Sequence, residues 1–465
     1  MMENFTPIDE VELNGFHKLL SIRSGGGWIM DGYVLSIIGV GMVQFSNALH
    51  LNGFWEGMIA SATLIGLFFG GFMGGGLTDL LGRQKLYFLG PMLFFFCSAA
   101  QYWANSGAEI FILRFMIGIG VGIEYPVAGS LLVEFMPKKY RGPRLARLTV
   151  LWFVGGALAY IFGTILLKYG GKEAWRLVLA SPAVIGLFLL VVRIGTPESP
   201  RWLISKGRDE EADIIIKKIY GPSFGLKNFS NETRGKRVKL ANLLQSGYGK
   251  RMFFVAVFWS CAVIPLFAVY SFAPQVLAAL NLVGSWEAYG SVAITLFFVV
   301  GCVIATYLVD VIGRRPLVIH SFLWSGLLLL ILGVFSRSSP ALILSLFGAY
   351  AIFIGGAQVL QLVYPNELFP TDIRALAVGM SASLSRIGAA IGTWLVPLSL
   401  QNLGICTTMY IAAFVSFVGF FVSLLLAPET LNLNLHEASS LEGRGMPERS
   451  VAVVADISSF VRKSK

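Results

Sequence analysis

Long apolar runs recur along the chain, separated by short breaks that are rich in charged and turn-forming residues. Each run is close to the roughly 20 residues that an α-helix needs to cross a bilayer. The pattern therefore indicates an all-α membrane protein. We predict twelve membrane-spanning helices, at residues 25–46, 54–75, 86–104, 108–133, 146–167, 175–195, 252–273, 288–309, 316–336, 340–363, 375–399 and 405–427.

The longest internal polar break divides these helices into six and six. Within this break, residues 206–219 have the pattern of a short amphipathic helix at the membrane surface. We therefore expect an amino-terminal six-helix bundle with a short cytoplasmic amino terminus at 1–196 and a cytoplasmic linker at 197–251. A carboxy-terminal six-helix bundle at 252–432 and a cytoplasmic tail at 433–465 complete the predicted organisation.

The composition supports a membrane protein and argues against several other classes. Only 13% of the residues are charged and 55% are hydrophobic, whereas a soluble domain carries about 25% charged residues. The net charge of +10 does not indicate nucleic-acid binding, because the Lys and Arg residues gather in one set of loops. The positive-inside rule makes those loops, and both termini, cytoplasmic.

Two short motifs occur once in each predicted bundle. The first, Leu-x-Asp-x-x-Gly-Arg, occupies 77–83 and 308–314, after the second helix of each half. The second, Glu-x-x-Pro-x-x-x-Arg, occupies 134–141 and 367–374, after the fourth helix. Matching motifs at matching places predict two homologous bundles related by a pseudo-twofold axis, an arrangement that secondary transporters use.

The first repeated motif has the residues of a tight turn beside a helix start. Gly82 and Gly313 permit such a turn. Asp79 and Asp310 are expected to accept hydrogen bonds from a nearby helix N-terminus, where negative charge is favoured.

The arginines of this motif are predicted to form ion pairs with the second motif. We expect Arg83 and Arg314 to pair with carboxylates such as Glu134 and Glu367. Our hypothesis is that these pairs latch the two bundles together on the cytoplasmic side and break when that side opens. The alternative is that they are static loop anchors.

These repeated loops are similar to the signature loops of the major facilitator superfamily. Further motifs resemble its sugar-porter branch and the metabolite:proton symporters whose first helix carries Asp-Gly-Tyr-Val-Leu. They lie at 31–35, 114–122, 174–176, 196–203, 367–374 and 427–430. The resemblance implies the major facilitator fold, alternating access and facilitated or proton-coupled movement of a small polar solute across a bacterial inner membrane. It also places Arg141, Glu198, Arg201, Arg374 and Glu429 in the cytoplasmic gate motifs.

The chain also departs from the sugar-porter pattern. Sugar porters carry glutamines in their fifth and seventh helices, but 146–167 and 252–273 contain none. The Glu-Tyr-Pro at 124–126 is more similar to the Asp-Tyr-Pro of phosphate and organic-ion symporters. These departures argue against a hexose as the substrate.

Four of the charged residues inside predicted spans stand out as candidates: Asp31, Arg114, Glu124 and Arg386. A charge there is costly, so it usually faces a partner or a cavity. The resemblance implies that Arg114 faces the acidic residue of the first helix, Asp31, and is released when that residue takes up a proton. The alternative is that the Arg114 side chain snorkels to the lipid headgroups.

We interpret Glu124 as a proton carrier or substrate contact, or else as part of a structural ion pair. Close helix approach is predicted at its neighbouring glycines.

Substrate contacts are predicted in the second half. Arg386 could attract an anionic substrate, balance a carboxylate or pair within its own bundle. Gln358 and Gln361 are three residues apart and share a helical face, so we expect both to contact the solute. Weaker candidates are Tyr33, Trp259 and Tyr270, because aromatic residues in such helices more often pack.

The sequence as a whole predicts a secondary active transporter for a sugar, a sugar acid or an organic acid, with proton symport. We expect it to act as a monomer in the lipid bilayer, with no catalytic set, cofactor or metal centre. An exporter of drugs or metabolites and a non-transporting nutrient sensor are alternatives on the same fold. The short tail argues against the sensor.

Overall fold

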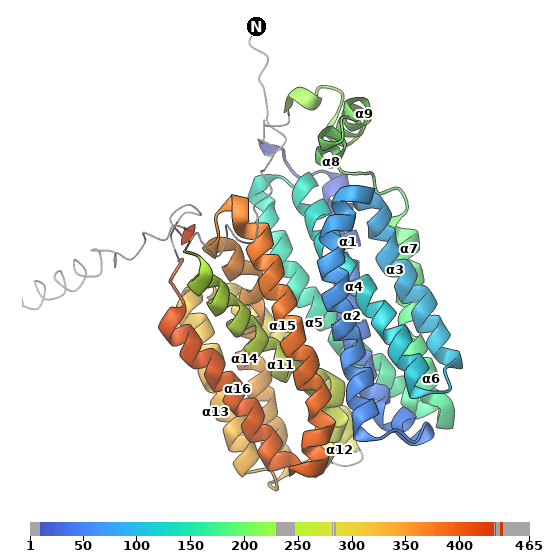
Figure 1. Cartoon of the computed structure of the whole chain (residues 1–465), viewed down its shortest axis with the longest axis vertical. Helices are drawn as coiled ribbons and strands as arrows, with labels where there is room; N and C mark the ends of the chain where they lie inside the picture. Colours follow the sequence, from blue (N-terminus) through green and yellow to red (C-terminus); the bar gives the residue numbers. More distant parts are fainter. Residues whose placement is uncertain are drawn as a thin grey trace, which may run out of the picture.

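The computed structural model describes residues 10–228 and 247–431, apart from 281, 283 and 284, and also residues 433, 438 and 439. The described part is helical, with no strand (Figure 1). In the first half, the helices are α1 (Gly15–Ala48), α2 (Gly53–Leu81), α3 (Arg83–Ala100), α4 (Gly107–Phe135), α5 (Lys138–Tyr169), α6 (Ala174–Ala180) and α7 (Pro182–Arg193). In the second half they are α11 (Gly249–Ala279), α12 (Ser285–Leu308), α13 (Arg314–Val334), α14 (Pro340–Leu368), α15 (Thr371–Asn402) and α16 (Gly404–Leu426).

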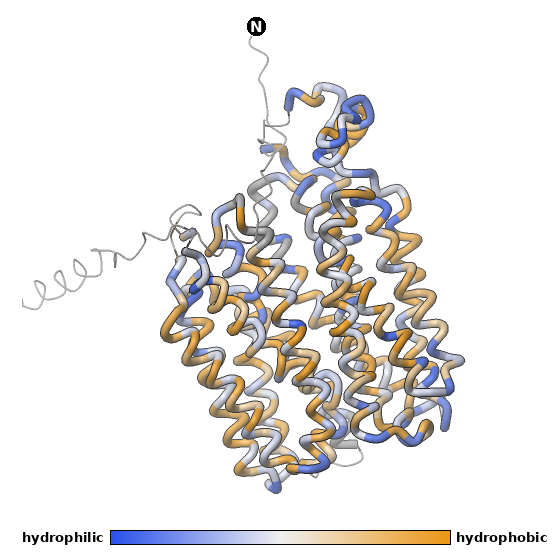
Figure 2. Tube along the Cα trace, in the orientation of Figure 1, coloured by the Kyte–Doolittle hydropathy of each residue, from blue (hydrophilic) through white to orange (hydrophobic). Residues whose placement is uncertain are grey.

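Every predicted span corresponds to helical structure. Within the described residues, ten helical stretches are long and apolar enough to cross a membrane, and α6 and α7 together form one of them. The other two predicted spans are α3 and α15. Helix α3 falls short in hydropathy because its first turn holds Arg83, Gln84 and Lys85. Hydrophobic residues line the lengths of the helices, as Figure 2 shows.

Helix α1 begins well before its predicted start. Asn14 caps it: the side-chain oxygen accepts a hydrogen bond from the His17 amide, and the Asn14 amide donates to His17 Nδ1, both at 3.1 Å. The glycines that follow Ser24 do not interrupt the helix. A Cβ at Gly25 or Gly26 would lie only 2.8 Å or 2.7 Å from a leucine side chain of a neighbouring helix, so these glycines serve packing.

The two halves repeat one packing arrangement. Helix α1 packs against α5 and α2 against α4, and correspondingly α11 packs against α15 and α12 against α14. Between the halves, α2 contacts α15, α5 contacts α12 and α1 contacts α11. The predicted close approach at the α4 glycines is confirmed, because a Cβ at Gly118 or Gly122 would overlap the backbone of α2.

Two short helices, α8 (Pro200–Ser205) and α9 (Asp209–Tyr220), lie at one end of the bundle (Figure 1). We call this the α8–α9 end. Helix α9 is the predicted amphipathic helix, and it is tied down where the Tyr220 hydroxyl donates to the Phe135 carbonyl at 2.8 Å. Residues 229–246 of the predicted linker lie outside the described residues.

Candidate substrate and proton-coupling site

A cavity of about 400 Å³ lies between the two halves. It is lined by residues of α1, α2, α4 and α5 on one side and of α11, α14 and α15 on the other. Its lining reaches Gly129, Asn366 and Gly379, which lie near the ends of α4 and α14 and the start of α15. These ends are at the α8–α9 end of the molecule, so the cavity extends toward that end.

At the opposite end the two halves are in contact. The Tyr160 hydroxyl of α5 donates a hydrogen bond of 2.8 Å to the Tyr270 carbonyl of α11. That carbonyl lacks its usual helical donor, because residue 274 is a proline and has no N–H. Helix α11 is kinked at Phe272, and the kink and the proline together leave the carbonyl available to the other half.

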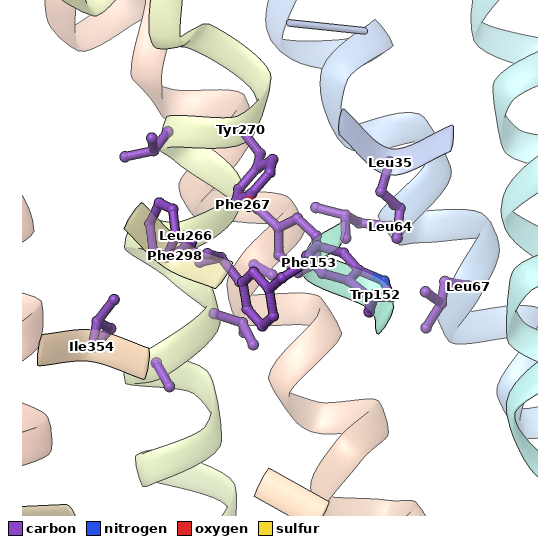
Figure 3. Packing of buried hydrophobic residues seen from close by; sticks show 14 of the residues in the cluster. Leu35, Leu64, Leu67, Trp152, Phe153, Leu266, Phe267, Tyr270, Phe298 and Ile354 are labelled. Carbon is purple, nitrogen blue, oxygen red and sulfur yellow. The ribbon is translucent and has the colours of Figure 1, made fainter. Parts of the chain in front are cut away.

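Aromatic side chains from both halves pack together beside this contact; Figure 3 shows Trp152, Phe153, Phe267, Tyr270 and Phe298 in this cluster. Trp152 of α5 packs edge-on against Phe267 and Tyr270 of α11, with ring centroids 5.9 Å and 5.7 Å apart. Phe153 stacks on Phe298 of α12 at 5.9 Å. This cluster separates the cavity from the far end of the molecule.

The predicted glutamine pair lines the cavity. Gln361 Nε2 donates to Gln358 Oε1 at 2.6 Å, and Gln358 Nε2 donates to the Ala262 carbonyl at 2.8 Å. Trp259, one of the weaker predictions, also lines the cavity. Three aromatic residues that line the cavity and that the sequence reasoning did not select are Trp28, Tyr125 and Trp152.

Arg386 of α15 lines the cavity as well. Its guanidinium carbon is 6.0 Å from the Tyr125 ring centroid and 5.9 Å from that of Phe267. Its buried Nε has no hydrogen-bond partner. Pairing of Arg386 within its own bundle, one of the predicted alternatives, is not found among the residues that the structure describes.

Tyr33 and Tyr270, two of the weaker substrate predictions, do not line the cavity in this conformation. The Tyr33 hydroxyl is hydrogen-bonded to Ser181 Oγ at 2.9 Å within the first half, and Tyr33 does not line the cavity. Tyr270 is fully buried in the aromatic cluster. Both residues therefore pack against other helices rather than face the cavity.

Glu124 has an ionic partner that the sequence reasoning missed, Arg193 at the end of α7. Both side chains are completely buried. Arg193 Nη1 donates to Glu124 Oε2 at 2.9 Å, and Nη2 donates to Oε1. The same guanidinium donates to the Tyr87 carbonyl at 2.6 Å and lies 3.7 Å from the Tyr87 ring centroid. Glu124 does not line the cavity, so the structure places it in an ion pair outside the cavity lining.

Glycines make room for this ion pair. A Cβ at Gly27 of α1 would overlap both Glu124 Oε1 and Arg193 Nη2, and one at Gly90 of α3 would lie 3.0 Å from Glu124 Oε2. The pair is thus enclosed by α1, α3, α4 and α7, and its geometry depends on glycine at these two positions.

Asp31 is fully buried on α1, and neither carboxylate oxygen has a hydrogen-bond partner. Its electrostatic neighbours are Glu124 and Arg193. Arg114, which the resemblance implied as its partner, instead donates a 3.4 Å hydrogen bond to the Val34 carbonyl. Val34 lies about one helical turn from Asp31. In this conformation Asp31 is therefore near Arg193, and the implied pairing with Arg114 is absent.

The gate motifs of the two halves are built alike. Gly82 and Gly313 have φ values of +97° and +93°, which only glycine adopts readily, so the predicted tight turns are confirmed. Glu198 accepts hydrogen bonds from the Arg83 and Gln84 amides.

In the second half, Glu429 accepts the corresponding bonds from the Arg314 and Arg315 amides. The acceptors at the helix N-termini are therefore Glu198 and Glu429. For Asp310 the predicted role is wrong, because that exposed carboxylate pairs with the Arg314 side chain at 3.2 Å.

The predicted ion pairs are present but do not join the halves. Arg83 and Glu134 are 3.2 Å apart, and Arg314 and Glu367 are 2.9 Å apart. The first pair joins α3 to α4 and the second joins α13 to α14, so each lies within one half. The predicted latch between the bundles is therefore corrected to a brace inside each bundle. Arg201 lies within electrostatic reach of Glu134, and the side chains of Asp79, Arg141 and Arg374 lie outside the described residues.

The profile of the family described as "Sugar (and other) transporter" matches residues 26–441. The chain belongs to this family. It is 36% identical to the inner membrane metabolite transport protein YgcS of Escherichia coli (strain K12), over 97% of this chain and 100% of that protein. It is also 26% identical to the arabinose-proton symporter of Bacillus subtilis (strain 168), over 95% of this chain and 98% of that one.

Solved structures agree on the fold. The partially occluded, inward-open xylose transporter XylE of E. coli superposes with a TM-score of 0.78 at 20% identity, covering 90% of this chain and 99% of that one. The predicted major facilitator fold is thereby confirmed. The protein is a multi-pass membrane transporter rather than an enzyme.

Proposed function

We propose that this chain is a symporter that moves a small polar metabolite together with protons across a bacterial inner membrane by alternating access. The observation that carries the proposal is Asp31, a buried carboxylate without a hydrogen-bond partner that lies beside the Glu124–Arg193 pair. The names of two relatives, an inner membrane metabolite transport protein and an arabinose-proton symporter, support the same function.

The cavity supports a solute site between the bundles. Its volume of about 400 Å³ is near the lower end of the roughly 300–1,000 Å³ of ligand sites, so it fits a small metabolite. Gln358 and Gln361 supply neutral donors and acceptors, Arg386 supplies a charge, and Trp28 and Trp259 supply flat apolar surfaces. This combination suits a hydroxylated solute.

The surroundings of Asp31 support proton coupling. Burial disfavours a charged carboxylate, whereas a neighbouring guanidinium favours it. Arg193 lies near Asp31, and Arg114 is hydrogen-bonded to the backbone carbonyl of Val34, one helical turn away. We propose that Asp31 exchanges its proton when helix movements change its distance to these two cations, so that rocking of the bundles and protonation are linked.

The orientation follows from the positive-inside rule. The α8–α9 end carries the basic loops, so we propose that it and both termini are cytoplasmic. The cavity then faces the cytoplasm, and the Tyr160–Tyr270 contact closes the outer side. The bundles at 1–196 and 252–432 would rock about the cavity as units, joined by the linker at 197–251, in a protein that acts as a monomer in the lipid bilayer.

The gate motifs would stiffen each bundle during this movement. The pairs Arg83–Glu134 and Arg314–Glu367 brace helices of one half, and Glu198 caps α3 in the same way as Glu429 caps α13. We propose that Asp79, Arg141, Arg201 and Arg374 belong to the same cytoplasmic motifs. Braced bundles move as rigid bodies, which alternating access requires.

The test uses purified protein in proteoliposomes that contain a pH-sensitive dye. Wild-type protein should admit protons when a transported solute is added outside. Asp31→Asn should lose this proton entry but still exchange labelled solute across the membrane, because exchange needs no net proton movement. Asp209→Asn, which removes an exposed carboxylate on α9, is the matched control. Solute-driven proton entry that persists in Asp31→Asn would contradict the assignment.

A further inference from the structure

We propose that the transported solute is a hydroxylated carboxylate, such as a sugar acid, and that Arg386 binds its carboxylate group. This inference rests on the proposed transport function and narrows its substrate class. The observation is an unpaired cation inside the solute cavity. Arg386 lines the cavity, its Nε is buried without a partner, and it forms no ion pair within the described residues.

The charges around the cavity leave Arg386 without a counterion from the protein. Arg386 is the only charged residue in the described lining. The nearest buried acids belong to another network, because Glu124 is held by Arg193 and neither Glu124 nor Asp31 lines the cavity. An unpaired cation in a partly dehydrated cavity is unfavourable, and an anionic solute removes that cost when it binds.

The chemistry of the guanidinium favours a carboxylate as the anion. Its planar fork of donors matches the two oxygens of a carboxylate. The Tyr125 and Phe267 ring centroids lie 6.0 Å and 5.9 Å from the guanidinium carbon. These apolar rings lower the local dielectric constant, which strengthens a hydrogen bond between charged groups. The cavity holds no acidic side chain that would repel the anion in the part of the lining that is described.

The rest of the lining indicates that the solute also carries hydroxyl groups. Gln361, Asn366 and Ser383 line the cavity. The amide nitrogens of Gln361 and Asn366 already donate to Gln358 Oε1 and the Leu362 carbonyl, so their amide oxygens and the Ser383 hydroxyl are the groups that hydroxyls of a solute can pair with. Trp152 and Trp259 offer flat faces for the carbon skeleton. A small hydroxylated acid uses all three features, whereas a neutral sugar leaves Arg386 unpaired.

The experiment compares solutes that differ only in the carboxylate. Purified protein in detergent is titrated with D-glucuronate against D-glucose and with D-gluconate against D-sorbitol, and binding is read from tryptophan fluorescence, since Trp28, Trp152 and Trp259 line the cavity. An acid should bind, and its neutral counterpart should bind at least tenfold more weakly. Arg386→Gln should weaken binding of the acid by about 10- to 150-fold, from the loss of charged hydrogen bonds.

Two further variants make the result specific. Arg386→Lys keeps the charge without the planar fork and should bind the acid with intermediate affinity. Arg337→Gln removes an exposed arginine that does not line the cavity and should bind like wild type. A gel-filtration profile equal to that of wild type shows that each variant is folded. Neutral solutes that bind as tightly as the acids, or acids that bind Arg386→Gln as tightly as wild type, would overturn the proposal.

Binding and transport are recorded separately, so the two proposals can fail independently. Acid binding that depends on Arg386 but drives no proton entry in proteoliposomes supports the anion site and contradicts proton symport. Proton entry driven by D-glucose or D-sorbitol supports symport and overturns the anion site.

Discussion

The buried ion pair between Glu124 and Arg193 gives a quantitative prediction. Breaking a buried pair by removing one partner costs about 3–5 kcal/mol, because the other charge remains buried. In Glu124→Gln the guanidinium keeps the Tyr87 carbonyl and the Tyr87 ring, so we expect a loss near the lower end, about 3 kcal/mol. In Arg193→Met the Glu124 carboxylate loses both guanidinium donors, so we expect a loss of about 5 kcal/mol.

The double variant tests whether the two residues act as a pair. Glu124→Gln with Arg193→Met contains no unpaired buried charge at this position, so it should lose no more stability than Arg193→Met alone, about 5 kcal/mol. The coupling between the two substitutions should therefore be about 3 kcal/mol, at the upper end of measured interaction energies. Glu211→Gln, which breaks an exposed pair with Arg208 on α9, is the control and should leave stability unchanged.

Stability is measured as the apparent melting temperature in detergent, from the monodisperse fraction that remains after heating and gel filtration. Such unfolding is often irreversible, so variants are compared at one heating rate. Additive effects of the two substitutions, or a melting temperature of Glu124→Gln equal to that of the control, would refute the argument that the pair is a coupled buried interaction.

Three further predictions follow from local geometry. Gly27→Ala should lower the melting temperature about as much as Glu124→Gln, because its Cβ would overlap the ion pair; a melting temperature equal to that of wild type would contradict this packing. Glu198→Ala and Glu429→Ala should each cost about 1–2 kcal/mol through loss of a helix cap, read as a lower melting temperature, and equal stability would show that the amides find other partners. Tyr160→Phe removes the hydrogen bond to α11 and should speed labelling of a cysteine at Ala382 by a membrane-impermeant reagent added outside; unchanged labelling would show that this bond does not hold the outer side closed.

The number and order of the helices were predictable because each apolar run of bilayer length corresponds to one helix. The residues at which the helices begin and end were less predictable. The glycine-rich stretch after Ser24 resembles a helix break, but in the structure these glycines admit neighbouring side chains. Position 27 needs glycine because the space beside it is filled by Glu124 and Arg193, which are far away in sequence, and a local pattern does not contain that information.

The candidate site was predictable in its residue types but not in its pairings. Glu124 stood out as a charge in an apolar run, and Arg193 at the end of the sixth predicted span was the available signal for its partner. The rotation of α4 and α7 decides that pairing. Similarly, the sequence predicted that Arg83 and Glu134 meet, but only the packing of α3 on α4 shows that their pair lies within one bundle.

The most direct test of the account is uptake of a labelled solute against its own gradient. The solute is the member of the acid and neutral panel that binds most tightly, supplied at equal concentration inside and outside proteoliposomes with the outside more acidic. Proton symport predicts that the solute accumulates inside and that a protonophore abolishes the accumulation. A solute that exchanges across the membrane without accumulating would contradict proton coupling and show that the protein is a facilitator.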